Sequence, residues 1–468
     1  MDESLHFKTI TELAGLIRSK KLSPVEATRA QLERIEKLDG RLRAYATVTA
    51  DLAMDQARRA EREITGGRHR GPLHGVPVAV KDLCFTRGVR TMGGSAVMMD
   101  HVPDHDSTVV ARLADAGAVL LGKLNLTEGA MGGYNPKLKA PENPWKESHW
   151  PGASSSGSGA ATAAGLAYGT LGSDTGGSIR HPSAVCGVVG LKPTWGRVSR
   201  YGVLALAESQ DHVGPITRSS ADAGIILQAI AGADPNDPTS LPDSVPDMLA
   251  GVGRGVSGVR IGFDEEFTAV DMAPDFAKAV VQGVEVMRKL GARIVPVKMP
   301  RRLREYVQAW PVICTAEALA AHSPYYPGRA AEYGPWFRGW LERGAAVTGA
   351  DYARANNLRA ACTGELRAMM RALDVFACPS TARAAYPVTP AILFGPIPPD
   401  RDPWQSRYTV PFNFAGLPTI SVPCGLSDEG LPLSLQFVGG PLSEDLLVRV
   451  GDAYERATEW HRLHPAGW

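Results

Sequence analysis

Short runs rich in valine, isoleucine and leucine alternate with amphipathic helical patterns along most of the chain, and this alternation restricts the fold more than any other feature. The runs predict strands over 76–80, 118–121, 259–263, 293–297, 374–378, 419–422 and 433–437. The helical patterns predict helices over 107–116, 157–166, 219–231 and 275–290. Strands separated by helices favour a layered α/β fold around a largely parallel or mixed sheet.

The N-terminal part of the chain, over 1–65, differs from the rest because its patterns are helical throughout. Ser23-Pro24-Val25-Glu26 is a capping box with proline at the first helical position. Apolar residues follow at helical spacing over 27–38, and 51–64 is a second amphipathic run. We expect a helical segment over 1–65, packed on a larger domain formed by 66–468.

The charge balance and the cysteines exclude several classes of protein. The chain has 50 Lys+Arg against 49 Asp+Glu, so it has no broad electrostatic footprint for nucleic acid or an anionic membrane. Its six cysteines form no Cys-x-x-Cys pair, which disfavours a disulfide framework or a zinc site and fits a reducing cytosol. The N-terminus has no basic region followed by an apolar region, as a signal peptide would have, and no uninterrupted apolar stretch has the length of a membrane span. We therefore expect a cytoplasmic protein with no membrane or nucleic-acid partner.

Two serine clusters framed by glycine carry the first chemical signal, at 151–159 and 172–180. Gly176 and Gly177 precede Ser178, so successive backbone N–H groups can turn toward one point and hold the negative oxygen of a tetrahedral intermediate. An ordinary Asp-Thr-Gly-Gly turn explains this segment at least as well when it is taken alone.

Lys81 gives the serines a candidate base. It follows the apolar run Pro77-Val78-Ala79-Val80, and a buried lysine must lose its charge or find partners. To act as a base, its pKa must fall from about 10.4 toward neutrality, which desolvation can achieve. A lysine that reaches from the strand end into water remains an equal alternative.

Ser154 can link the base to the nucleophile, because a serine between Lys81 and Ser178 donates to one and accepts from the other. A flexible Gly/Ser linker is the alternative. The run Ala160-Ala161-Thr162-Ala163-Ala164, which follows directly, is typical of a packed helix and argues against a linker.

Taken together, these motifs resemble the amidase signature family, in which a Gly/Ser-rich stretch precedes a Gly-Gly-Ser-Ile-Arg segment at the separation that Ser154 and Ser178 have here. The similarity continues through 186–194, 196–199, 413–418 and 421–425, so it covers nearly the whole chain. The resemblance implies a layered α/β/α sandwich around a large mixed β-sheet and an amidohydrolase that needs no metal or other cofactor.

The resemblance also implies a Ser–cis-Ser–Lys triad. By matching motifs, Ser178 is the nucleophile, Ser154 follows a cis peptide bond and Lys81 is the terminal base. Backbone N–H groups of Thr175, Gly176, Gly177 and Ser178 form the oxyanion hole, and Ala130 lines the acyl pocket. Asp174 and Arg180 are expected to support the loop. Ala153 and Ser156 replace glycines found in many relatives, which puts the detailed loop geometry in question but not the triad.

The substrate is less defined. Aromatic residues concentrate over 306–340, which suits either a pocket for an aryl or bulky apolar amide or a helical core. Esters or carbamates are further candidate substrates, and the family implies a possible homodimer. A second enzyme hypothesis is the glutamine-hydrolysing subunit of a tRNA-dependent amidotransferase. Arg338 could serve a substrate carboxylate there, but the acid expected near Ser406-Arg407-Tyr408 is missing, although Asp402 is close.

Three further hypotheses are weaker. The run 117–124 nearly fits a phosphate loop, but Leu124 stands where Ser or Thr would hold magnesium. His101 and His105 have a spacing seen in metal sites, but Pro103 lies between them and favours a polar loop. A histidine-based serine hydrolase is disfavoured because the serines above lack a Gly-x-Ser-x-Gly elbow.

Overall fold

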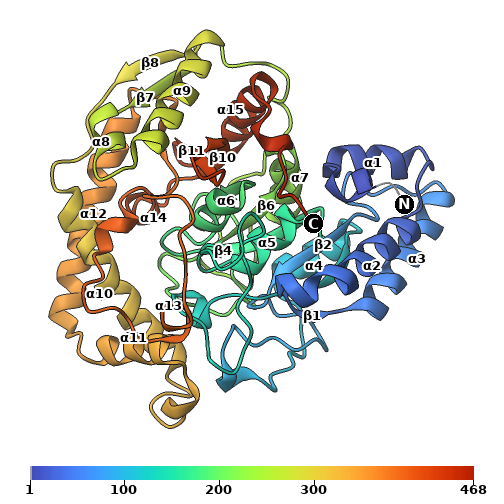
Figure 1. Ribbon diagram of the computed structural model, residues 1–468, viewed down its shortest axis with the longest axis horizontal. Coiled ribbons are helices and arrows are strands. Elements are labelled where there is room, and N and C mark those ends of the chain that lie inside the picture. Colours follow the sequence, from blue (N-terminus) through green and yellow to red (C-terminus); the bar gives the residue numbers. More distant parts are fainter. Residues whose placement is uncertain (1–2) are drawn as a thin grey trace.

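A mixed sheet of 11 strands forms the centre of the computed structural model, which describes residues 3–468 (Figure 1). The strands are β1 (Tyr45–Val48), β2 (Pro77–Lys81), β3 (Val119–Leu124), β4 (Gly169–Asp174), β5 (Val189–Lys192), β6 (His212–Thr217), β7 (Arg260–Phe263), β8 (Arg293–Pro296), β9 (Val375–Pro379), β10 (Thr419–Leu426) and β11 (Pro432–Gly439). Their order is β1-β3-β2-β4-β6-β5-β10-β11-β9-β7-β8. β2 is parallel to β3 and β4, β7 is parallel to β8 and β9, and the remaining pairs are antiparallel.

Helices cover both faces of this sheet. They are α1 (Ile10–Arg18), α2 (Pro24–Leu42), α3 (Ala50–Thr65), α4 (Thr108–Asp115), α5 (Ser156–Ala163), α6 (Arg180–Cys186), α7 (Ser220–Ile230), α8 (Glu265–Ala269), α9 (Pro274–Lys289), α10 (Leu303–His322), α11 (Pro335–Ala345), α12 (Gly349–Met370), α13 (Pro390–Phe394), α14 (Val410–Phe414) and α15 (Glu444–Ala457). Neighbouring residues of β11 reveal the layers: Gln436 accepts a hydrogen bond from Arg180 of α6, whereas the Phe437 ring packs against α15. Because successive strand residues point to opposite faces, α6 and α15 lie on opposite sides of the sheet, and the predicted α/β/α sandwich is confirmed.

The N-terminal region contributes a strand as well as helices. Helices α1–α3 lie at one end of the molecule and α10–α12 at the other (Figure 1). After α2, Arg43 turns the chain in the left-handed conformation, and β1 then pairs with β3. The prediction of an entirely helical 1–65 is therefore wrong for Tyr45–Val48, because the partner of this strand lies far away in the sequence, at Gly122–Leu124. The division of the chain at residue 65 stays a prediction.

The strands and helices predicted after residue 65 are all present, with ends that differ by a few residues. The strands after residue 65 that the sequence patterns missed, β4, β5 and β6, lie in the middle of the sheet and are fully buried. β4 reads Gly-Thr-Leu-Gly-Ser-Asp, which has low intrinsic strand propensity, so its conformation depends on the pairing with β2 and β6. This strand leads directly into the Ser178 loop.

The run proposed as a phosphate loop belongs to the sheet. Residues 119–124 form β3, and the buried Lys123 ammonium donates to Thr91 at 2.6 Å and lies 3.4 Å from Asp82. This lysine therefore does not project from a loop toward a bound nucleotide.

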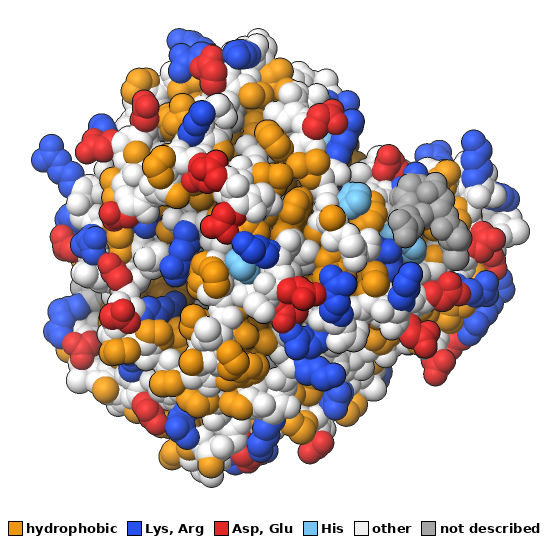
Figure 2. All heavy atoms as spheres, viewed as in Figure 1, with side chains coloured by type: hydrophobic (Ala, Val, Ile, Leu, Met, Phe, Trp, Pro, Cys, Tyr) orange, Lys and Arg blue, Asp and Glu red, His pale blue; other side chains and the backbone are white. Residues whose placement is uncertain are grey.

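Acidic and basic side chains are interspersed over the face of the molecule in Figure 2, in keeping with the formal net charge of +1. All six cysteines are buried as free thiols. Within residues 3–468, none of the helices combines the length and the apolar character that crossing a membrane requires.

Candidate active site

The neighbouring parallel strands β2 and β4 bring the predicted site residues together. Lys81 is the last residue of β2, and β4 ends at Asp174, four residues before Ser178. Because the strands are parallel, both ends lie at the same edge of the sheet. Ala79 packs in a cluster with alanines of α5, and the two-residue period of a strand directs Lys81 to the same face. The lysine thus points to the start of α5, directly after Ser154 and Ser155.

The Lys81 amine lies among three serine hydroxyls, at 2.6 Å from Ser154, 2.9 Å from Ser155 and 2.8 Å from Ser173. Its side chain is 0% exposed, so the alternative of a lysine that reaches into water is wrong. Burial lowers the pKa of Lys81 to about 7, although Cys84, Asp174 and Asp211 act in the opposite direction. The amine is therefore neutral in a substantial fraction of molecules near pH 7.

The number of hydrogen bonds that a neutral Lys81 can donate determines which serine hydroxyls accept from it and which one donates to it. A neutral amine has two N–H donors and one lone pair, so one of the three hydroxyls must donate to the nitrogen. The Ser155 hydroxyl donates to the Ser173 carbonyl oxygen at 3.2 Å, so it accepts from Lys81. The donor to the amine is then the hydroxyl of Ser154 or Ser173.

Ser154 is fully buried and lies just before helix α5. The Ala153–Ser154 peptide bond is cis, as the resemblance implied, and α5 starts two residues later. The backbone carbonyl of Ser154 accepts from the Thr127 N–H at 3.3 Å. The interpretation of 151–159 as a flexible linker is therefore wrong.

A buried ion pair between Asp174 and Arg180 stabilises the Ser178 loop. Asp174 accepts from the Arg180 guanidinium at 2.8 and 3.0 Å and from the Asn413 amide at 2.9 Å. Burial opposes ionisation of this carboxyl, but Arg180 holds its pKa well below the usual range. Asp174 also accepts from the backbone N–H groups of Gly177 at 2.8 Å and Ile179 at 3.1 Å. This carboxylate therefore sets the backbone conformation around the nucleophile.

The hydrogen bond from the Gly177 N–H to Asp174 limits which backbone groups can form the oxyanion hole. Because the N–H of Gly177 points to Asp174, the N–H groups of Thr175, Gly176 and Ser178 are the donors left to face a substrate. The indole N–H of Trp310 donates to the Thr175 carbonyl oxygen at 3.0 Å and fixes the loop from the other side.

Ser178 is half-buried and lines a cavity of about 560 Å³. Its backbone carbonyl accepts from the Ser155 N–H at 3.3 Å, which ties the two serine segments together. Of the two links expected in the triad, the hydrogen bond between Lys81 and Ser154 is formed. Within the described part of the chain, the Ser178 hydroxyl makes no side-chain hydrogen bond, so the link from Ser154 to Ser178 is not formed.

Five tyrosine and tryptophan side chains line this cavity: Tyr134, Trp150, Trp310, Trp336 and Tyr386. Ala130, in the left-handed conformation with φ of 59°, also lines it. From the aromatic-rich 306–340 segment, two tryptophans face the cavity, while Tyr306, Tyr333, Phe337 and Trp340 belong to the buried core. Each of the two interpretations of this segment therefore holds for part of it.

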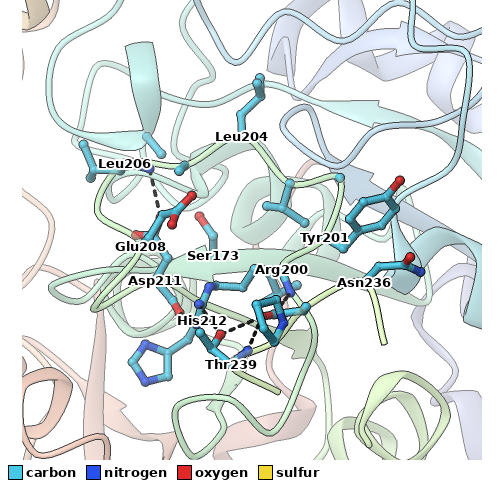
Figure 3. A pocket seen from close by; sticks show the side chains of 17 residues that line it. Ser173, Arg200, Tyr201, Leu204, Leu206, Glu208, Asp211, His212, Asn236 and Thr239 are labelled. Atoms are coloured by element: carbon cyan, nitrogen blue, oxygen red, sulfur yellow. Dashed lines mark hydrogen bonds between the residues drawn. The ribbon is translucent and has the colours of Figure 1, made fainter. Parts of the chain in front are cut away.

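A second cavity, of about 310 Å³, is lined by residues that include Ser173 and Asp211 (Figure 3). The Thr175 hydroxyl donates to Asp211 at 2.5 Å, and the N–H groups of Leu206 and Ala207 also donate to this carboxyl. Burial raises the pKa of Asp211 to about 6. Ala130 lines this cavity as well as the first one.

Sequence reasoning missed Ser155 and Ser173 as partners of Lys81. Ser155 stands next to a predicted site residue, but Ser173 required the pairing of β2 with β4, which the patterns did not reveal. It also missed several cavity residues that come from distant parts of the chain: Trp150, His181, Arg383, Tyr386 and Arg401.

The two histidines considered as metal ligands have other contacts. His105 pairs with Asp104 at 2.7 Å, and the rings of His101 and His105 both lie near Phe85. Across residues 3–468, no group of three or more His, Cys, Asp and Glu side chains is arranged to hold a metal ion.

With this geometry established, comparison with known proteins identifies the family. Residues 26–448 match the Amidase family. The chain is 43% identical to the putative amidase AmiD of Mycobacterium bovis, over 97% of this chain and 95% of the relative, and 40% identical to a glutamyl-tRNA(Gln) amidotransferase subunit of a Geobacter species, over 97% and 98%. A crystal structure of a bacterial aryl acylamidase superimposes with a TM-score of 0.88 at 26% identity, over 100% of both chains. A buried lysine among serines, on this fold and with these relatives, means that the chain belongs to the amidase signature family of enzymes.

Proposed function

We propose that this enzyme hydrolyses a carboxylic amide through an acyl-enzyme on Ser178, with Ser154 and Lys81 as the proton relay. The observation that carries the proposal is the buried Lys81 amine, 2.6 Å from Ser154, beside the cavity that Ser178 lines. A pKa of about 7 suits a group that must accept a proton and return it near neutrality.

In the first half-reaction, Ser178 Oγ attacks the carbonyl carbon of the amide. Its proton passes to Ser154 while the Ser154 proton passes to the Lys81 amine. The negative oxygen of the tetrahedral intermediate accepts from the free backbone N–H groups of the loop. The C–N bond then breaks, the nitrogen takes a proton back through Ser154, and an ester to Ser178 remains. Water cleaves this ester by the same route and releases the acid.

The aromatic walls support an aryl or bulky apolar amide as substrate. Trp150, Trp310 and Trp336 provide flat apolar surface in the cavity that Ser178 lines. The same acyl-enzyme chemistry extends to esters and carbamates, whose carbonyl carbons undergo the same attack.

The test is the hydrolysis of a panel of aliphatic amides, anilides, carbamates and glutamine by the wild type and by Ser178→Ala. The wild type should hydrolyse at least one anilide or bulky amide, and the variant should lose turnover by several orders of magnitude with an unchanged thermal unfolding curve. Near-normal turnover by the folded variant would refute the assignment of the nucleophile.

The second candidate is the glutamine-hydrolysing subunit of a tRNA-dependent amidotransferase, which the 40% identity to such a protein favours. Two side chains weaken it. Asp402 lines the cavity but lies 3.3 Å from Arg304, and Arg338 on α11 lies 3.7 Å from Glu342. Glutaminase activity together with co-purifying partner subunits would favour this candidate over the first.

The remaining expectations are part of the same proposal. They are a cytoplasmic location, a homodimer, no membrane or nucleic-acid partner, and a boundary near residue 65 between the N-terminal segment and the catalytic domain.

A further inference from the structure

Two arginines line the cavity of Ser178 without an acidic partner. Arg383 and Arg401 both border it, and neither forms an ion pair with a carboxylate in the described chain. By contrast, other arginines near the cavity are neutralised: Arg180 pairs with Asp174 and Arg304 with Asp402. The proposed mechanism uses neither Arg383 nor Arg401.

Aromatic rings hold both guanidinium groups in place. The Arg383 guanidinium carbon lies 4.0 Å from the centre of the Tyr386 ring, and that of Arg401 lies 5.1 Å from the centre of the Trp336 ring. Contact with a ring face leaves the N–H edges of a guanidinium able to donate, and Arg383 uses part of its edge for the Tyr386 hydroxyl. Burial raises the pKa of the Tyr386 hydroxyl, and both arginines oppose this rise, so both charges lie close to the same tyrosine.

The charge of Arg401 also influences His181, which packs on the loop of the nucleophile. Arg401 is an exposed residue whose guanidinium lies against the Trp336 ring. Burial lowers the pKa of His181 to about 4, with contributions from Arg180 and Arg401. The His181 ring packs so closely on Gly177 that a methyl group there would lie 2.5 Å from it. Arg401, His181 and Ser178 all line the same cavity.

Two acidic residues line the same cavity and must be weighed against the arginines. Asp402 accepts from the Trp404 N–H at 2.9 Å and lies 3.3 Å from Arg304, so its charge is engaged. Asp400 carries the other negative charge and is exposed, as Arg383 and Arg401 are. Besides burial, three side chains shift the pKa of Arg401: Tyr386, Arg343 and Cys314. None of the three is a carboxylate.

We propose that the preferred substrate is an amide that also carries a carboxylate, which Arg401 and Arg383 bind while the aromatic walls hold the apolar part. A guanidinium presents paired N–H donors that match the two oxygens of a carboxylate, and such charge-assisted hydrogen bonds are stronger than neutral ones. This inference rests on the proposed amide hydrolysis and names its substrate class.

Matched substrate pairs test the inference, one for each side of the scissile bond. For the acyl side, the 4-nitroanilide of succinic acid, with its free carboxylate, is compared with the 4-nitroanilide of butyric acid. For the amine side, 4-acetamidobenzoate is compared with N-(4-methylphenyl)acetamide, in which a methyl group replaces the carboxylate. The wild type should show a kcat/KM about tenfold or more higher for the charged member of at least one pair, mainly through a lower KM.

Variants then assign the preference to the arginines. Arg401→Gln should reduce the charged-to-neutral ratio of kcat/KM about ten- to hundredfold, Arg383→Gln should reduce it less, and Arg401→Lys should restore part of it. Arg354→Gln is the matched control, because Arg354 is exposed on α12, where it pairs with Asp351. It should leave the ratio unchanged. Unchanged thermal unfolding curves verify that each variant is folded.

The outcomes separate this inference from the proposed function. Equal kcat/KM within both pairs, or a preference that Arg401→Gln leaves intact, would overturn the carboxylate site while amide hydrolysis stands. Hydrolysis of neither member of either pair, nor of any amide in the wider panel, would overturn the proposed function and the inference with it. A preference for the charged member that disappears in Arg401→Gln supports both.

Discussion

Asp174 and Arg180, which flank Ser178 in the sequence, form two hydrogen bonds of 2.8 and 3.0 Å in a fully buried layer beneath it. The same carboxylate accepts from the Gly177 and Ile179 N–H groups, so one side chain fixes the backbone on both sides of the nucleophile. The geometry of the site therefore depends on an ion pair that takes no part in the proposed chemistry.

Replacing Asp174 with asparagine should lower the free energy of unfolding by about 3–5 kcal/mol, because the buried Arg180 charge loses its counter-ion. Urea denaturation followed by circular dichroism measures this change. Glu305→Gln breaks the exposed pair of Arg302 and Glu305 and should leave the unfolding free energy nearly unchanged. Equal effects of the two substitutions would contradict the role given to Asp174.

The pH dependence of the reaction should follow Lys81. Only the neutral amine accepts a proton, and burial sets its pKa at about 7, so kcat/KM should rise with pH between about 6 and 8 and then level off. Initial rates from pH 5 to 9 on a neutral amide measure the profile. A flat profile, or one that falls over this range, would show that Lys81 is not the base.

Ser154 and Ser173 both contact Lys81 but should respond differently to replacement by alanine. Ser154→Ala interrupts the proposed proton path and should reduce kcat by about a hundredfold or more at every pH. Ser173→Ala removes one acceptor for the charged amine, so it should shift the midpoint of the pH profile below that of the wild type with a smaller loss of rate. Profiles of the two variants that coincide would mean that both serines only position the lysine.

Trp310 should affect catalysis through the loop backbone. Its indole N–H donates to the Thr175 carbonyl, so Trp310→Phe should reduce kcat by about tenfold as the oxyanion donors lose their alignment. Trp340, whose ring centre lies 5.9 Å from that of Trp310, offers the matched Trp340→Phe control, which removes an indole N–H without touching Thr175. The kcat values on one substrate compare the two, and a similar loss in both would point to packing of the aromatic cluster instead.

Local sequence patterns revealed much of the fold because they report on local forces. The strand before Lys81 and the helix after Ser155 were predicted from valine-rich and alanine-rich runs. The patterns did not reveal β1 at Tyr45–Val48 or β4 at Gly169–Asp174, whose conformations depend on hydrogen bonds to distant strands. A tetrapeptide in a helical neighbourhood and a strand with two glycines carry little signal of their own.

The sequence by itself determined the chemical groups of this protein and their order: a lysine at the end of a strand, two glycine-framed serine segments, and the family in which they occur. Only the tertiary structure decided that Lys81 is buried among three hydroxyls and that Asp174 accepts a hydrogen bond from the Gly177 N–H. It also decided that Arg383 and Arg401, which form no ion pair in the described chain, line the cavity of Ser178. The reason is physical. A pKa and a binding preference depend on which groups surround a charge and how much water remains, and residues from distant parts of the chain supply those surroundings.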